Sequence, residues 1–184
     1  MIGNIEESVK ILMSGGIILY PTDTIWGIGC DATNTNSINK IYEIKKRPKN
    51  KPLILLVNDI KMLSKYVKTL SKEIIKIINT SETPTTIIYP NPKNLPKILT
   101  QTNTIAIRIT NDYFCNEVIK KLNKPIISTS ANISNDKNPK NFKQVKKKIK
   151  ENVDYIVKHK INLNMEKASR IIKINSQNKI ELIR

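Results

Sequence analysis

Residues 104–129 read TIAIRITNDYFCNEVIKKLNKPIIST, and their pattern indicates the class of fold. The two ends, 104–109 and 125–129, are short apolar runs rich in β-branched residues, which is typical of buried strands. Between them, residues 111–122 carry apolar side chains at helical spacing, and Asn111 or Asp112 can cap this helix. A strand, a capped helix and a second strand in immediate succession predict an α/β fold.

The alternation continues on both sides of this stretch. Asn4 is expected to cap a first helix that ends at Gly15–Gly16. Further helices are expected at 37–45, 59–79 and 142–150. Strands are expected at 17–20, 54–57, 85–89 and 153–157, followed by a hairpin of 170–174 and 179–184 that turns at 175–178. This order predicts one α/β domain over residues 1–184 with a mostly buried, mixed sheet.

Length and composition exclude several classes of protein. A chain of 184 residues can bury a core without disulfides, and its apolar runs are too short to span a bilayer. The first residues, MIGNIEES, show no signal-peptide pattern, so a cytoplasmic location is expected. Cys30 and Cys115 form no Cys-x-x-Cys site. The only histidine, His159, excludes a His/Cys zinc site and leaves few ways to build a Ser-His-Asp hydrolase.

The net charge of +17 suggests an anionic partner such as a nucleic acid, a nucleotide or phosphate. However, 28 of the 32 basic residues are lysines, and such a bias also arises by drift in an AT-rich coding sequence. The five lysines within 142–150 illustrate both interpretations. If Phe142, Val145 and Ile149 face inward, these lysines form either a solvated helix face or a patch that contacts tRNA.

Glycine-rich phosphate-binding loops are absent, so side chains and strand-end amides must hold any nucleotide. Polar groups instead follow expected strands or helices, where ligand sites of α/β folds gather. In YPTDTIWGIG, residues 20–29, Thr22 and Thr24 follow a strand, and Gly27 and Gly29 let the backbone approach a ligand. The alternative is a polar loop whose Trp26 packs in the core.

Two cations follow a helix in IKKRPKNKPL, residues 44–53. Pro48 biases Arg47 toward an extended conformation, in which Lys45 and Arg47 point to the same side and Lys46 faces water. The pair would then bind phosphate or carboxylate. A basic helix end that complements the helix dipole is the alternative.

Small hydrogen-bonding side chains end the strand in PIISTSAN, residues 125–132. Ser130 and Asn132 stand two positions apart with Thr129 beside them, which suits a ribose or phosphate site, although an ordinary strand cap is the alternative. Near the C-terminus, Ser169 leads into a strand and Arg184 is the last residue.

Taken together and in this order, YPTDTIWGIG, IKKRPKNKPL, TPTTIIY, IAIRI, STSAN and the late serine closely resemble the YrdC/Sua5 family in its short, single-domain form. The resemblance implies a YrdC-like twisted mixed sheet with flanking helices around a basic cavity. It also implies L-threonylcarbamoyladenylate synthase activity, in which L-threonine, bicarbonate or CO2, and ATP with Mg2+ give threonylcarbamoyl-AMP and pyrophosphate. The product would pass to a tRNA threonylcarbamoyl transferase complex for modification of adenosine 37 (t6A37).

The resemblance also implies roles for individual residues. Lys45 and Arg47 would act on the threonine carboxylate and the phosphates as the catalytic pair. The other substrate- and nucleotide-binding residues would be Thr22, Thr24, Thr86, Arg108, Ser130, Asn132, Ser169 and Arg184. No metal ligand from the protein is implied.

Several positions depart from the family pattern. The loop before Thr86 keeps one proline of Pro-Gly-Pro, Arg170 replaces a usual threonine, and Asn135 stands where a glycine is common. A non-catalytic tRNA- or dsRNA-binding module of the same fold is the alternative function, and weak tRNA binding is compatible with either. A carbamoyltransferase-type domain is disfavoured because the chain lacks the accessory domains expected there.

Overall fold

The computed structural model describes residues 1–165, 167–175 and 180–184. Its helices are α1 (Ile2–Met13), α2 (Thr35–Ile44), α3 (Ile60–Ser64), α4 (Lys72–Thr80), α5 (Tyr113–Leu122) and α6 (Lys147–Lys150), with 3-10 turns at Lys97–Leu99 and Phe142–Gln144. Its strands are β1 (Ile18–Tyr20), β2 (Gly27–Gly29), β3 (Ile54–Val57), β4 (Thr85–Pro90), β5 (Thr104–Ile109), β6 (Ile126–Ser130), β7 (Tyr155–Ile156), β8 (Arg170–Ile174) and β9 (Ile180–Leu182).

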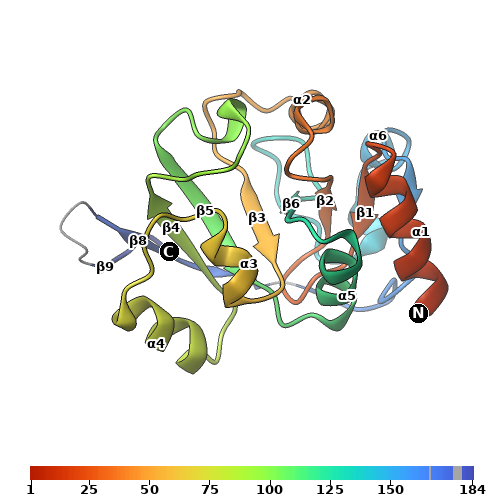
Figure 1. The fold of residues 1–184 in the computed structure, drawn as a ribbon. Helices are drawn as coiled ribbons and strands as arrows, with labels where there is room; N and C mark the ends of the chain where they lie inside the picture. Colours follow the sequence, from red (N-terminus) through yellow and green to blue (C-terminus); the bar gives the residue numbers. More distant parts are fainter. Residues whose placement is uncertain (166, 176–179) are drawn as a thin grey trace.

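The strands of this part of the chain form one mixed sheet in the order β7-β1-β2-β6-β3-β5-β4-β8-β9. The sheet contains parallel pairs such as β3–β5 and antiparallel pairs such as β3–β6 and β4–β5. Figure 1 shows the sheet twisted, with α1, α3 and α5 on its near side and α4 at its lower edge. The prediction of an α/β fold with a mixed sheet is confirmed.

The stretch 104–129 folds as its pattern predicts. Strand β5 and helix α5 follow each other directly, and the side chain of Asp112 caps α5 by accepting a 3.0 Å hydrogen bond from the N–H of Cys115. Helix α5 ends at Asn123, whose φ of 54° lies in the left-handed region that asparagine tolerates. Strand β6 then returns two strands away from β5, because β3 lies between them.

Three expectations for the helices are wrong. Helix α1 begins at Ile2, so Asn4 lies within it and accepts a 2.8 Å hydrogen bond from the hydroxyl of Tyr155. The helix expected over 59–79 is split into α3 and α4. The helix expected over 142–150 shortens to a 3-10 turn and α6, because the backbone of Val145 and Lys146 is extended. Like charges four residues apart, at Lys146 and Lys150, disfavour a continuous helix there.

Other expectations hold or fall outside the described residues. Phe142, Val145 and Ile149 belong to the core or pack against it, as expected. Strands β8 and β9 pair antiparallel as the expected hairpin, while positions 176–178 of its turn lie outside the described residues. Strand β2 was not expected. It carries Gly27 and Gly29 and pairs with both β1 and β6.

Gly29 is a position where the fold excludes a side chain. A Cβ atom added there would lie 2.2 Å from the carbonyl oxygen of Ile127 and 2.9 Å from the ring of Tyr20. Both neighbours are fixed, since Ile127 belongs to β6 and Tyr20 is completely buried. The glycine therefore permits the close approach of β2 to its surroundings.

We expect Gly29→Ala to lower the free energy of unfolding by about 2–3 kcal/mol, as overpacking of a closed core does. Urea denaturation measures the effect. Gly3→Ala is the matched control, because Gly3 lies in α1 with nothing within 4 Å of the added Cβ. That substitution should stabilise the protein by about 0.5–1 kcal/mol. Equal effects of the two alanines would contradict the role given to Gly29.

Candidate functional site

A cavity of about 330 Å3 lies on one face of the sheet. The register places Ile88, Ala106, Ile54 and Ser128 side by side across β4, β5, β3 and β6, and all four line this cavity. Seven of the ten expected binding residues line it as well: Thr22, Thr24, Arg47, Arg108, Ser130, Ser169 and Arg184. The sheet thus brings together segments that are far apart in the sequence.

The loop after β1 is held in shape by Thr22. Its hydroxyl accepts hydrogen bonds from the N–H groups of Thr24 (2.9 Å) and Ile25 (3.2 Å) and lies 2.8 Å from the hydroxyl of Thr24. Thr22 and Thr24 are both buried, and both face the cavity. Trp26 is completely buried and packs 5.2 Å from the ring of Phe142, measured between ring centroids. The loop is therefore part of the cavity wall, and its tryptophan is part of the core.

Arg108 forms the floor of the cavity. It is only 4% exposed, forms a 3.0 Å ion pair with Asp23 and donates a 3.3 Å hydrogen bond to the hydroxyl of Thr24. Its Nε–H has no partner within the described residues. A buried guanidinium with a donor to spare is suited to a carboxylate or phosphate ligand. Asp23 was not among the expected site residues, although its position between two site threonines could have indicated it.

Arg47 points at the cavity for a reason other than the one expected. The chain is not extended at this point: Lys45 is helical, and Lys46 has a φ of 49°. The N–H of Lys46 bonds to the carbonyl of Glu43, and that of Arg47 bonds to the carbonyl of Tyr42, which is a Schellman end of α2. The Arg47 guanidinium donates to the carbonyls of Lys51 (3.4 Å) and Pro52 (2.9 Å) at the cavity edge.

Lys45 does not form a clamp with Arg47. Its side chain is completely buried, and its ammonium donates to the carbonyls of Ser130 and Asn132 and, at 3.1 Å, to the Asn132 side-chain oxygen. The expectation that both cations point to one side of an extended strand is wrong. Lys45 lies behind the cavity wall and fixes the end of β6.

Ser130 and Asn132 form a linked pair at this strand end. The Ser130 hydroxyl donates a 2.6 Å hydrogen bond to the side-chain oxygen of Asn132, whose amide donates at 2.7 Å to the carbonyl of Asp136. Ser130 lines the cavity, while Asn132 stands one layer behind it. Asn135 adopts a φ of 73°, which asparagine tolerates where the family pattern often has glycine.

A second linked pair closes the far side of the cavity. The hydroxyls of Thr86 and Ser169 lie 2.8 Å apart, both buried, and Ser169 faces the cavity. Arg184 donates a 3.1 Å hydrogen bond to the carbonyl of Ser169 and also lines the cavity. Arg170 bonds instead to the hydroxyl of Ser81 at 3.2 Å. Arg170, which stands where the family pattern usually has threonine, therefore does not displace Ser169 from the cavity.

The cavity is strongly basic. Three guanidinium groups line it, and none of the described lining residues is acidic; Asp23 stands behind, paired with Arg108. Ser128 and Asn138 add polar groups that were not expected. No group of three acidic, histidine or cysteine side chains that could hold a metal ion occurs in the described ranges. Within the same ranges, no helix has the length and apolar character needed to cross a membrane.

Comparison with known proteins agrees with this geometry. Residues 10–184 match the Sua5/YciO/YrdC family model, which is described as telomere recombination. The chain is 32% identical over 169 residues to threonylcarbamoyl-AMP synthase of Pseudoalteromonas translucida, covering 90% of each chain. It is 36% identical over 152 residues to the enzyme of the same name from Psychromonas ingrahamii, covering 80% of each.

Solved structures share the fold. P. abyssi Sua5 complexed with L-threonine superimposes with a TM-score of 0.86 at 24% identity, covering 98% of this chain and 53% of that one. E. coli YciO superimposes with a TM-score of 0.81 at 23% identity, covering 98% and 87%. The present chain thus spans about half the length of the Sua5 chain.

Fold and site together define a YrdC-like α/β domain with a basic small-molecule cavity. The family match extends over nearly the whole chain, and curated relatives that it matches over most of their length carry the name of a synthase. The protein belongs to the Sua5/YciO/YrdC family and is an enzyme of the nucleotidyltransferase type. The family resemblance of the sequence motifs is confirmed.

The protonation of Lys45 is expected to make the stability of the protein depend on pH. Burial, together with the neighbouring Arg47 guanidinium, lowers the pKa of Lys45 to about 7, against about 10.4 in an unfolded chain. Between these two values the unfolded chain binds one more proton than the folded chain, so stability rises with pH. We therefore compare the free energy of unfolding of the wild type with that of Lys45→Met. The difference between them should increase in favour of the wild type from about pH 7 to about pH 9.5.

Urea titrations at the two pH values measure this difference, with exposed Lys65→Met as the control that shows no such gain. A wild-type advantage that stays constant over this range would mean that the three oxygen acceptors keep the ammonium charged.

Proposed function

We propose that the protein is an L-threonylcarbamoyladenylate synthase, which converts L-threonine, bicarbonate or CO2, and ATP to threonylcarbamoyl-AMP and pyrophosphate. The observation that carries the proposal is the convergence of Arg47, Arg108 and Arg184 on one hydroxyl-lined cavity. Threonine, ATP, bicarbonate and both products are anionic or carry anionic groups, and a cavity of this charge suits them. The curated relatives are named for the same product.

The two ends of the cavity suit different substrates. Arg108 is the buried cation, and its free Nε–H can pair with the threonine carboxylate, with the Thr24 and Ser169 hydroxyls beside it. Arg47 and Ser130 lie at the other side and can bind the ATP phosphates, with Asn132 as the support of Ser130. Within this proposal Lys45 and Thr86 act by positioning Ser130 and Ser169.

The proposed reaction needs no covalent intermediate on the enzyme. The threonine amine adds to CO2 and loses a proton to form a carbamate; with bicarbonate, water is also released. A carbamate oxygen then attacks the α-phosphorus of ATP, the bond to the bridging oxygen breaks, and pyrophosphate leaves with that electron pair. Alignment and stabilisation of negative charge are the work required of the protein.

The residues around the cavity fit this chemistry. Guanidinium and hydroxyl groups supply donors for phosphate oxygens. Cys30 and Cys115 are buried, and burial raises the pKa of each thiol, so neither is a candidate nucleophile. Mg2+ is proposed to arrive with ATP and to neutralise phosphate charge. The product is proposed to serve t6A37 modification by a tRNA threonylcarbamoyl transferase complex in the cytoplasm.

The alternative, a non-catalytic RNA-binding module, depends on the lysines of 142–150. Three of these five lysines have partners: Lys146 pairs with Asp136 at 3.0 Å, Lys147 pairs with Glu151 at 3.5 Å, and Lys150 lies over the Phe142 ring. This pairing reduces the charge available to RNA, so the alternative is the less favoured proposal.

The decisive experiment measures pyrophosphate release from ATP by the purified protein, with and without L-threonine and bicarbonate. We expect release that requires both. Release without threonine would indicate a different ATP-consuming reaction. No release, together with tight salt-dependent tRNA binding, would favour the RNA-binding module.

Arg47→Ala is expected to lower kcat/KM for ATP at least tenfold, because a hydrogen bond to a charged group contributes roughly 1.5–3 kcal/mol. The exposed Lys49→Ala is the matched control and should leave turnover unchanged. Near-normal kinetics of a folded Arg47→Ala protein would remove Arg47 from the proposed site.

The exposed lysines of 142–150 test the position of the active cavity. We expect the double substitution Lys143→Ala and Lys148→Ala to leave pyrophosphate release unchanged and to weaken any tRNA binding in a salt-titrated filter assay. A large loss of pyrophosphate release would mean that the reaction takes place outside the cavity described above.

A further inference from the structure

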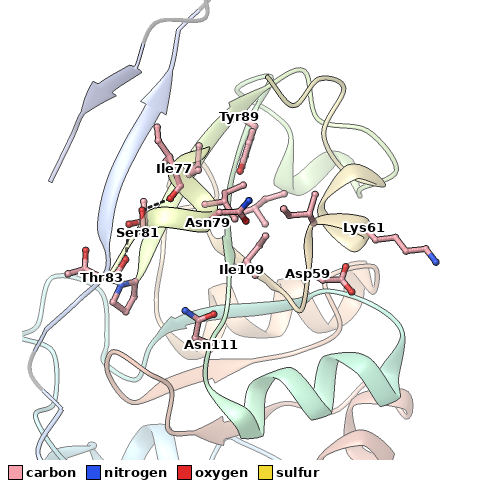
Figure 2. A pocket seen from close by; sticks show the side chains of 15 residues that line it. Asp59, Lys61, Ile77, Asn79, Ser81, Thr83, Tyr89, Ile109 and Asn111 are labelled. Atoms are coloured by element: carbon pink, nitrogen blue, oxygen red, sulfur yellow. Dashed lines mark hydrogen bonds between the residues drawn. The ribbon is translucent and has the colours of Figure 1, made fainter. Parts of the chain in front are cut away.

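A second cavity, of about 650 Å3, lies on the opposite face of the sheet, beneath α3 and α4 (Figure 2). Side chains of a strand alternate between its faces, so β4 and β5 present different residues to the two cavities. Arg108 and Ala106 face the first cavity. The residues that alternate with them form the wall of the second: Ile87, Tyr89, Ile107 and Ile109.

Helix α4 covers this space without sealing it. Its apolar face carries Ile74, Ile77 and Ile78, yet only Ile74 is buried. Ile77 and Ile78 are half-buried and line the cavity. An amphipathic helix ordinarily packs such a stripe directly on a sheet, and an unfilled apolar space is unfavourable. The volume lies within the range of small-molecule sites.

Tyr89 supplies a polar group beside the isoleucines of this cavity. The residue is only 2% exposed, and its hydroxyl has no hydrogen-bond partner in the part of the chain that the structure describes. Figure 2 shows the side chain directed into the cavity, toward Asn79 and Ile109. Burial raises the pKa of Tyr89, so the hydroxyl remains protonated and can both donate and accept.

The charged groups of this cavity stand at its mouth. The Asp59 carboxylate caps α3, where it accepts a 2.6 Å hydrogen bond from the N–H of Met62. The Lys61 side chain extends away from the cavity (Figure 2). The other polar lining residues are neutral: Asn79, Ser81, Thr83, Thr85 and Asn111. Apart from the two charged groups at the mouth, the lining is therefore uncharged but mixed: isoleucine side chains of α4, β4 and β5 stand beside neutral polar groups, of which the Tyr89 hydroxyl is one.

We propose that this cavity binds an uncharged small molecule that has an apolar body and one hydrogen-bonding group held by Tyr89. The site is distinct from the basic cavity, because β4 and β5 lie between the two. The proposal is independent of the synthase reaction, which uses only the other face of these strands.

The test uses the purified protein without ATP or threonine. The probe is N-phenyl-1-naphthylamine, a neutral amine with one N–H whose fluorescence rises in apolar surroundings. We expect saturable binding of one molecule per chain. Tyr89→Phe should weaken binding about two- to tenfold, as loss of one neutral hydrogen bond does. Tyr66→Phe, at a buried tyrosine outside this cavity, is the matched control and should not change binding.

A second variant and a competitor locate the probe. Ile78→Trp should fill the cavity and abolish saturable binding, while added ATP should not displace the probe. Binding that does not saturate, that ATP displaces, or that Tyr89→Phe leaves unchanged would overturn the proposal. The Tyr89 and Tyr66 pair decides the outcome even where Ile78→Trp fails to fold. Because no substrate is present, the result does not depend on whether the synthase reaction is correct.

Discussion

The buried ammonium of Lys45 connects the parts of the molecule that must meet at the basic cavity. It reaches from the end of α2 to the end of β6, where it is held by the Ser130 and Asn132 carbonyls. In return, the carbonyl of Lys45 accepts the N–H of Ser134 at 2.8 Å. An ammonium without water is costly unless oxygen acceptors surround it, and three do. This contact fixes Ser130 in the cavity wall. It also fixes the end of α2, so that Arg47, two residues after Lys45, is directed toward the same cavity.

The alternation of side chains along β4 and β5 gives the sheet two different surfaces. On one surface, Arg108 and the hydroxyl groups beside it form a basic cavity, with a guanidinium buried deeply enough to keep a spare donor. On the other, isoleucines and Tyr89 form a neutral cavity beneath α4. Two strands can line both cavities because successive side chains of a strand point to opposite faces of the sheet. The basic cavity and the neutral cavity are thus separated only by the thickness of the sheet.

The basic cavity is suited to reactions that need charge stabilisation more than a nucleophile. Its hydroxyls occur in linked pairs, Thr22 with Thr24 and Thr86 with Ser169; both members of the first pair and Ser169 of the second line the cavity. Such pairing fixes donors before a ligand arrives, which lowers the reorganisation required during the reaction. The excess of lysine over arginine in the composition contributes little here, since the cations that line the cavity are all arginines.

Local patterns in the sequence were sufficient to predict those helices and strands that apolar runs and capping residues define. Short apolar runs rich in β-branched residues marked β3, β5 and β8, and the Asp112 cap marked α5. The order of the motifs also indicated the family and most of the cavity residues. Only the tertiary structure decided that Lys45 turns inward, that Asp23 pairs with Arg108, and that α4 leaves Ile77 and Ile78 half-buried. Those features depend on contacts between residues far apart in the chain, which no local period encodes.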